Sequence, residues 1–179
     1  HLKEGVRIHL VGVSRDDLFG KLKVWGVTSF DSAMPVRQAF MDDKHNYHTT
    51  GEDYLAIRVP KVSSSPQLQR RVNNGEVSAG EAFNCEKESL RALRRYDDRE
   101  ISVERALEKI RRYEMLFNGR DQVDEYRKTL GDRPWEQCEC DVCRNIGVEV
   151  TMLRGRERNK RRGFHNMRVL YEKVVDARR

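Results

Sequence analysis

The stretch Cys-Glu-Cys-Asp-Val-Cys at residues 138–143 brings three of the four cysteines of the chain into six positions. Cys138, Cys140 and Cys143 follow the pattern C-x-C-x2-C, in which short loops bring thiolates to one centre, as tetrahedral zinc requires. A disulfide is disfavoured, because three clustered cysteines leave one unpaired and nothing in the sequence marks secretion. A redox pair of Cys140 and Cys143 is the other alternative, but it would leave Cys138 without a role. The pattern therefore predicts zinc.

A fourth zinc ligand must come from elsewhere in the chain. The candidates are His165, Cys85, His45 and His48. His165 directly follows a turn and lies at the start of an expected helix, but spacing alone leaves the choice open, since a single histidine is more often structural. With four protein ligands the site would be closed, and it would therefore be structural rather than catalytic.

Asp31 is the second residue whose position could carry chemistry. It follows an expected strand, and in (β/α)8 barrels the carboxyl ends of the strands carry the catalytic residues. An aspartate at this point also suits a simple turn, and by position alone the turn is the better interpretation.

The net charge of +6 is spread unevenly along the chain. Residues 1–143 hold 24 basic and 25 acidic residues, whereas residues 144–179 hold 11 basic and 4 acidic residues. This excess predicts a loop that binds a polyanion such as nucleic acid, although a solvated helix face is the simpler alternative. Six basic residues within nine positions make up the expected loop: Arg154, Arg156, Arg158, Lys160, Arg161 and Arg162.

The composition suits one domain with a core and much exposed helix, or a part of something larger. The chain has 179 residues, of which 36% are charged and 37% hydrophobic. No apolar run approaches the roughly 20 residues of a membrane span, and no signal peptide is present, so we expect a cytoplasmic protein with no membrane partner. The sequence begins without Met, and we expect it to be the C-terminal part of a longer protein.

The expected elements alternate between strand and helix at the start of the chain and become helical later. Residues 6–13 predict a largely buried strand, Ser14 begins a helix that runs to about Trp25, Gly26 ends that helix, and residues 27–30 form a second strand. This βαβ order predicts a parallel sheet and an α/β fold. Further predicted elements are a strand at 54–59, helices at 86–96, 102–117 and 121–130, a strand at 148–153, the basic loop, and a helix at 164–175.

Taken together, these residues resemble the tRNA-guanine transglycosylases, (β/α)8-barrel enzymes that exchange guanine for a 7-deazaguanine base. Residues 30–37, Phe-Asp-Ser-Ala-Met-Pro-Val-Arg, are similar to the family's signature Phe-Asp-Cys-Val-Met-Pro-Thr-Arg. The family's zinc motif, C-x-C-x2-C followed by a His-Asn pair, matches Cys138, Cys140, Cys143 and His165-Asn166. The similarity covers roughly residues 5–40 and 135–172.

The resemblance implies the C-terminal portion of a TIM barrel, divided into a last βαβ unit (1–60), a helical insertion (61–134) and a zinc-binding subdomain (135–179). Asp31 would be the nucleophile that forms a covalent glycosyl-enzyme intermediate, and Arg37 would contact nucleic acid. The second catalytic aspartate and the base-recognition residues of the family would lie outside this chain, so the segment alone would be inactive. The resemblance also implies a 7-deazaguanine substrate for the full-length protein and a homodimer.

The phrase Arg154-Gly155 followed by Arg161-Arg162-Gly163-Phe164-His165-Asn166, together with the long insertion, resembles the DNA-modifying branch of the family. Departures from the family's signature put recognition of the tRNA anticodon in doubt. Ser32-Ala33 replaces Cys-Val, Val36 replaces Thr, and Phe40 stands where the family has an arginine that helps to read the tRNA anticodon loop. The alternatives are a non-catalytic, zinc-stabilised subunit that binds nucleic acid, and a zinc module with a basic arm outside the family.

Overall fold

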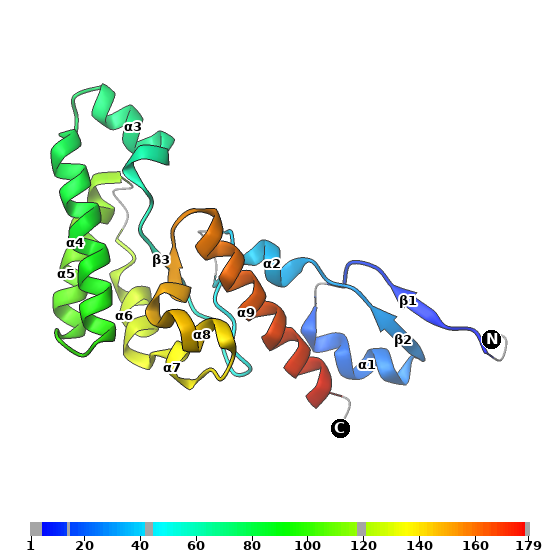
Figure 1. Cartoon of the computed structure of the whole chain (residues 1–179). Helices are drawn as coiled ribbons and strands as arrows, with labels where there is room; N and C mark the ends of the chain where they lie inside the picture. Colours follow the sequence, from blue (N-terminus) through cyan, green and yellow to red (C-terminus); the bar gives the residue numbers. More distant parts are fainter. Residues whose placement is uncertain (1–4, 14, 42–44, 118–120, 178–179) are drawn as a thin grey trace.

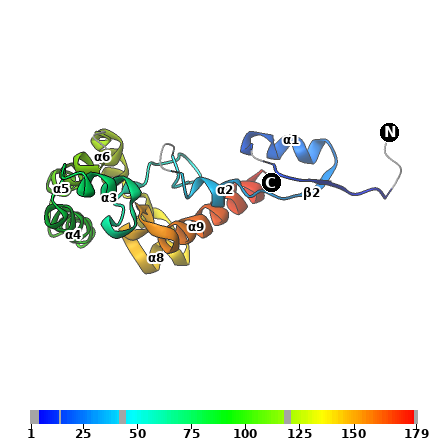
Figure 2. The ribbon, with the colours of Figure 1, turned by 90° about the horizontal axis from the view of Figure 1, so that it is seen from above.

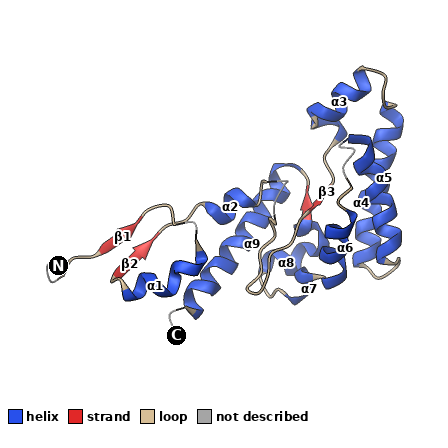
Figure 3. Ribbon diagram, turned by 180° about the vertical axis from the view of Figure 1, so that it is seen from behind, coloured by secondary structure: helices blue, strands red, loops and turns tan. Residues whose placement is uncertain are grey.

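The computed structural model describes residues 5–13, 15–41, 45–117 and 121–177, and the described part is mixed α/β but mostly helical (Figure 3). The β1–α1–β2 unit lies at one end, helices α3–α6 lie at the other, and α7–α9 lie between them (Figures 1 and 2). No helix within the described ranges combines the length and the apolar character needed to cross a bilayer.

The first unit is the predicted βαβ arrangement. Strands β1 (Ile8–Leu10) and β2 (Val27–Phe30) pair in parallel, and a 3-10 turn (Asp16–Leu18) followed by α1 (Phe19–Val24) connects them. Gly26 ends the helix with a φ of +75°, a left-handed conformation that glycine adopts without steric cost. Ser14, the predicted cap, lies outside the described residues. A parallel pair of this kind would occur in a barrel, and the barrel itself stays a prediction.

The prediction that the first strand is largely buried is wrong for this structure. Val6 is 49% exposed and Val11 is 80% exposed. A parallel strand is buried only when both faces of its sheet are covered. Here α1 packs on one face of a two-stranded sheet, where the rings of Phe19 and Phe30 stack with centroids 5.1 Å apart.

The helical segment and the cysteine-containing segment share one hydrophobic core. Residues from both sides of the expected boundaries at 60/61 and 134/135 meet in it, including Ile57, Leu93, Ile110, Cys143 and Val150. The strand predicted at 54–59 is reduced to β3 (Ile57–Arg58), which pairs in parallel with β4 (Met152–Leu153). The remaining helices are α2 (Met34–Gln38), α3 (Pro66–Asn73), α4 (Ala79–Asp97), α5 (Val103–Phe117), α6 (Val123–Asp132), α7 (Pro134–Gln137), α8 (Asp141–Ile146) and α9 (Gly155–Asp176).

Two predictions in the last third of the chain are corrected. The strand expected at 148–153 is a 3-10 helix (Gly147–Thr151) followed by the two residues of β4. The expected basic loop forms the first turns of α9, which begins at Gly155 rather than near Phe164. Arg, Lys and Glu are good helix formers, so a run rich in these residues continues the helix.

Glu114 of α5 is a buried carboxyl group that makes the stability of this core depend on pH. Its side chain is fully buried and accepts hydrogen bonds from Tyr126 Oη (3.0 Å) and the Gln122 amide (3.4 Å). Burial raises the pKa of Glu114 above its ordinary value. A carboxyl group with a raised pKa in the folded state contributes stability at low pH that is lost as the pH rises above its ordinary value.

We expect Glu114→Gln to raise the free energy of unfolding at about pH 7 and to leave it nearly unchanged at about pH 4, where the carboxyl group is largely protonated in both states. Urea unfolding at the two pH values measures the difference. Glu108→Gln, an exposed residue on the same helix, serves as the control. A benefit from Glu114→Gln that is equal at both pH values would contradict the assignment.

Candidate metal centre and nucleophile loop

Three cysteines and one histidine from three helical segments meet at one point. Cys138 follows α7, Cys140 caps the start of α8, Cys143 lies within α8, and His165 lies on α9. Their ligand atoms all lie within 4.8 Å of one another. The Nδ1 atom of His165 is 3.5 Å from the sulfurs of Cys138 and Cys140 and 3.3 Å from that of Cys143.

These distances fit structural zinc. A tetrahedral ion with Zn–S bonds of about 2.3 Å and a Zn–N bond of about 2.0 Å separates sulfur from nitrogen by about 3.5 Å. All four positions would be filled by protein atoms, so a bound ion would hold the fold rather than activate water. The structure therefore selects His165 among the four candidates for the fourth ligand. His48 faces the cluster through its backbone carbonyl, and Cys85 lies on α4.

The imidazole of His165 is oriented by neighbours outside the ligand set. Its Nε2–H donates to the carbonyl oxygen of His48 at 2.8 Å. This leaves the lone pair of Nδ1, on the side of the sulfurs, available to ligate a metal ion. The ring of Tyr47 stacks on the imidazole with centroids 4.2 Å apart, and its hydroxyl lies 3.3 Å from Cys143 Sγ. These contacts fix both the tautomer and the plane of the ligand.

Mutual hydrogen bonding within the cluster shifts the acidity of its members. A hydrogen bond from Cys143 lowers the pKa of Cys138 to about 3, and the same bond together with burial raises the pKa of Cys143. Burial opposes the charged form of His165, but hydrogen bonds to Cys138 and Cys140 outweigh it and raise the pKa of His165 to about 9. A cation and protons compete for the same atoms, so metal affinity falls with falling pH.

Asp31 directly follows β2 and presents its carboxylate at the surface. The side chain is 57% exposed, and Oδ1 accepts a hydrogen bond of 2.7 Å from the backbone amide of Gly12. Gly12 has a φ of +72°, and the amide of Asp31 donates to the carbonyl of Leu10. The carboxylate therefore lies at the carboxyl end of the parallel pair, with one oxygen held by the loop after β1.

His9 is a neighbour of Asp31 that the sequence analysis missed. Its Nε2 lies 3.7 Å from Asp31 Oδ2, and its Nδ1 is 2.9 Å from Ser29 Oγ. Part of this proximity could be expected from the sequence, because alternating residues of two parallel strands point to the same side of the sheet. The register of the strand pair, which decides whether the two residues meet, was not available from the sequence.

The metal centre and the segment after Asp31 are joined through Asn166, the residue after the ligand His165. Its fully buried side chain donates to the carbonyls of Pro35 (3.1 Å) and Asn46 (3.0 Å) and accepts from the amide of His48 (3.1 Å). Pro35 belongs to α2, which begins three residues after Asp31. One amide thus holds the ligand-bearing helix, the segment that orients His165, and the helix beside Asp31.

Two of the six basic residues of the predicted loop face inward, which corrects the expectation that they contact phosphates. Arg162 is fully buried and donates to the carbonyls of Val150, Met152 and Ala39. Arg154 is 8% exposed, forms an ion pair with Glu86 and donates to the carbonyl of Val59. Internal acceptors bind both guanidinium groups, and only Nε of Arg162 is buried without a hydrogen-bond partner on that side chain.

The other predicted basic residues remain at or near the surface. Arg158 is paired with Glu149 at 2.7 Å, and Lys160 with Glu157 at 3.2 Å. Arg37, Arg156 and Arg161 are exposed, and no ion pair or hydrogen bond of their side chains is found among the described residues. These three side chains are available to a ligand.

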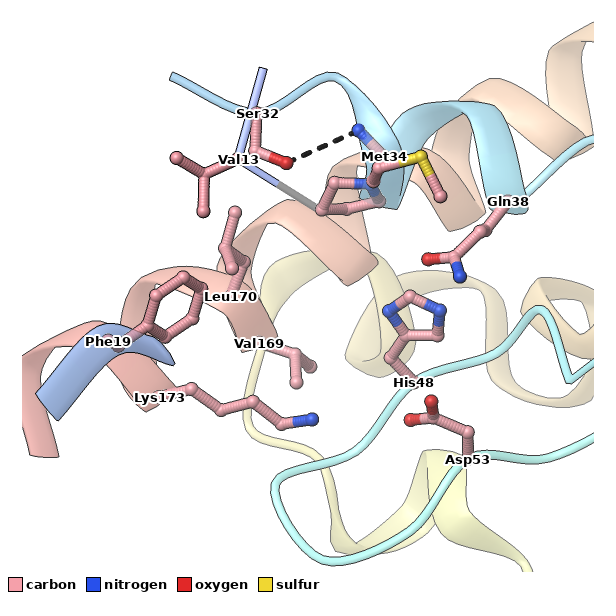
Figure 4. Close-up of a pocket in the computed structure, with 11 residues that line it drawn as sticks. Val13, Phe19, Ser32, Met34, Gln38, His48, Asp53, Val169, Leu170 and Lys173 are labelled. Carbon is pink, nitrogen blue, oxygen red and sulfur yellow. Dashed lines mark hydrogen bonds between the residues drawn. The ribbon is translucent and has the colours of Figure 1, made fainter. Parts of the chain in front are cut away.

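A small polar cavity lies between the segment after Asp31, residues 48–53 and α9. Its volume is about 110 Å³, and its lining includes Ser32, Gln38, His48, Asp53 and Lys173. The side chains of His48, Asp53 and Lys173 converge in it, and Ser32 Oγ accepts a hydrogen bond from the amide nitrogen of Met34 (Figure 4). A cavity of this size and polarity has room for a few water molecules beside the nucleophile loop.

The metal centre predicts zinc in the purified protein. We expect about one zinc per chain, and Cys138→Ser or His165→Ala should abolish binding and lower the melting temperature, because structural zinc contributes on the order of 10 kcal/mol to small folds. Metal analysis and thermal unfolding with a chelator measure both effects. Cys85→Ser removes the thiol outside the cluster and should keep its zinc. Full zinc in the His165→Ala protein would remove His165 from the ligand set.

The Asn166 amide predicts a stability cost that is separate from metal loss. Asn166→Ala leaves a buried amide and two buried carbonyls without partners, so we expect a loss of roughly 2–5 kcal/mol in the free energy of unfolding, with zinc retained. Denaturant unfolding of the zinc-loaded protein measures the loss. Asn145→Ala, at an exposed position on α8, should cost less than about 0.5 kcal/mol. Equal stability of the two variants would show that the tether carries little energy.

Comparison with known proteins supports the assignment that the motifs suggested. No family model matches the chain. The chain is 44% identical over 178 residues to the DNA-guanine transglycosylase of Salmonella montevideo, and the match covers 97% of this chain and 43% of the relative. The chain thus spans less than half the length of that relative. At this level of identity over nearly all of its residues, the chain belongs to the guanine transglycosylase family.

Proposed function

We propose that the full-length protein exchanges guanine for a 7-deazaguanine base in nucleic acid, with Asp31 as the nucleophile. The observation that carries the proposal is the exposed carboxylate of Asp31 at the carboxyl end of a parallel strand pair, with Oδ1 held by the Gly12 amide. Strand ends of this kind are where α/β barrels keep their catalytic residues. The similarity to a DNA-guanine transglycosylase supports the same reading.

The proposed reaction is a double displacement at the anomeric carbon. An oxygen of Asp31 attacks that carbon, and the bond to guanine breaks with its electron pair leaving on the base, which gives a covalent glycosyl-aspartyl ester. The incoming deazaguanine then displaces the carboxylate, and two inversions restore the original configuration. The proton transfers to and from the bases would use the second aspartate of the family, which the resemblance places outside this chain.

The local geometry supports one oxygen of Asp31 as the attacking atom. The Gly12 amide binds Oδ1 at 2.7 Å and restricts rotation of the carboxylate, whereas Oδ2 lies 3.7 Å from His9 Nε2 on a side chain that is 57% exposed. A nucleophile that is oriented before the substrate binds lowers the activation free energy, because less entropy is lost on reaching the transition state. A zinc ion held by Cys138, Cys140, Cys143 and His165 would take no part in the reaction and would support the loop through His165 and Asn166.

The proposed nucleic-acid contacts are the exposed cations near this loop and on α9. Arg37 lies on α2, six residues after Asp31, and Arg156, Lys160 and Arg161 lie on the first turns of α9. Contacts to phosphate weaken as salt rises, because binding releases condensed counterions. We favour DNA over tRNA, because the similar Salmonella protein is a DNA-guanine transglycosylase and Phe40 replaces the arginine expected for anticodon recognition.

The nucleophile is tested by Asp31→Asn in the full-length protein. We expect base exchange to fall by at least about a thousandfold and the covalent protein–DNA adduct to disappear, because a neutral amide does not attack the anomeric carbon. Incorporation of labelled guanine and adduct formation on denaturing gels measure the two steps. Asp98→Asn, an exposed carboxylate at the end of α4, is the control and should exchange normally. Exchange that survives in Asp31→Asn would favour a subunit that only binds nucleic acid.

A further inference from the structure

The cations of α5 and α6 are all neutralised by nearby acids. Exposed ion pairs of this kind contribute little to stability, but they cancel the field at the surface. The pairs are Arg105–Glu108, Lys109–Glu88, Arg111–Asp121, Arg112–Glu81, Arg127–Glu104 and Lys128–Glu52. The described side chains of α5 and α6 therefore present no unpaired cation to a polyanion.

The outer face of α4 is different. Lys87 and Arg91 are exposed one helical turn apart, and neither side chain has an ion pair or hydrogen bond among the described residues. The acids of α4 do not compensate these charges. Glu81 and Glu88 lie close to the cations of α5, and Glu86 is mostly buried against Arg154.

Helix α9 adds positive charge beside this face. Arg94 of α4 and Arg158 of α9 bind the two oxygens of one carboxylate, Glu149, at 2.8 and 2.7 Å. Two guanidinium groups on one carboxylate leave a net positive charge. Four cations form this α4 basic surface: Lys87, Arg91, Arg94 and Arg158. The first three of these cations line a groove on α4, whose other lining residues are Phe83, Asn84, Glu86, Leu90 and Arg95.

We propose that the α4 basic surface binds the phosphate backbone of the nucleic-acid substrate, as a contact region separate from the nucleophile loop. The spacing suits this partner, because Lys87 to Arg94 spans about 10 Å along the helix, which is the rise of about three base pairs. An α-helix with cations on one face contacts phosphates without reading the sequence. The chemistry is charge complementarity with a polyanion, and the paired cations of α5 and α6 make the α4 side the more positive of the two.

The location of this surface limits the shape of the substrate. Helix α4 and the β1–α1–β2 unit lie at opposite ends of the molecule (Figures 1 and 2). A nucleic acid that contacts both must be extended, as a DNA duplex is. This step rests on the proposed function, because it assumes that the target nucleotide is at Asp31, whereas phosphate binding by α4 does not depend on that assumption.

The test compares binding of fluorescent DNA duplexes of about 40 and about 12 base pairs, roughly 140 and 40 Å long, by the full-length protein. The variant is Lys87→Gln with Arg91→Gln, which removes two charges and keeps helix-forming side chains. We expect weaker binding of the long duplex and a salt dependence whose log–log slope falls by about 2. Between 50 and 200 mM salt this corresponds to a change of roughly tenfold in relative affinity.

The matched control is Arg111→Gln with Arg127→Gln, which removes two exposed charges that line a groove on the α5–α6 side. Zinc content and circular dichroism verify that both variants fold. Wild-type affinity and slope in the α4 variant, or equal losses in variant and control, would overturn the proposal. Asp31→Asn separates the two ideas, because it should lose adduct formation and keep the wild-type salt slope. If Asp31→Asn exchanges bases normally while the α4 variant still loses affinity, only the proposed function fails.

Discussion

The side-chain amide of Asn166 is the interaction on which the arrangement of the chain depends. It binds the carbonyl of Pro35 in α2, the carbonyl of Asn46 and the amide of His48, while the adjacent His165 binds the carbonyl of His48. The backbone N–H and the backbone carbonyl of His48 are therefore both bound by consecutive residues of α9. Because His165 is also a metal ligand, a bound ion fixes α9, and α9 in turn fixes the helix that follows Asp31.

Helix α9 can act in this way because it packs closely on α2. Gly163 lies at the contact, where even an added methyl group would already touch the backbone of Val36 at 3.5 Å. Arg162 extends the contact by donating to the carbonyl of Ala39, just beyond α2. The same guanidinium also binds the carbonyls of Val150 and Met152, so one buried cation of α9 joins two distant backbone segments that do not pair with one another.

The sequence predicted the parts of the fold that depend on local pattern. The βαβ unit was predicted from the order of strand-like and helix-like segments and from Gly26 between them. The cysteines of the metal centre were predicted from their spacing, and both features are found in the structure. The choice of His165 required the family motif, because spacing alone did not separate it from three other candidates. The direction of each arginine in the basic run could not be predicted, since it depends on carbonyls that distant segments supply. The predicted division into three domains stays a prediction, although one core crosses both expected boundaries.

The distribution of charge along the sequence differs from the distribution of charge on the surface of the structure. Arg154 and Arg162 of the basic run are buried and donate to internal acceptors. Burying a guanidinium is costly unless carbonyls or carboxylates accept its hydrogen bonds. Residues 1–143 hold nearly equal numbers of acids and bases, yet the acids of α4 lie toward α5 or are buried, which leaves Lys87 and Arg91 unbalanced. The positive surface of the chain is therefore set by which acids the helix packing uses, and it reaches a segment whose composition gave no sign of it.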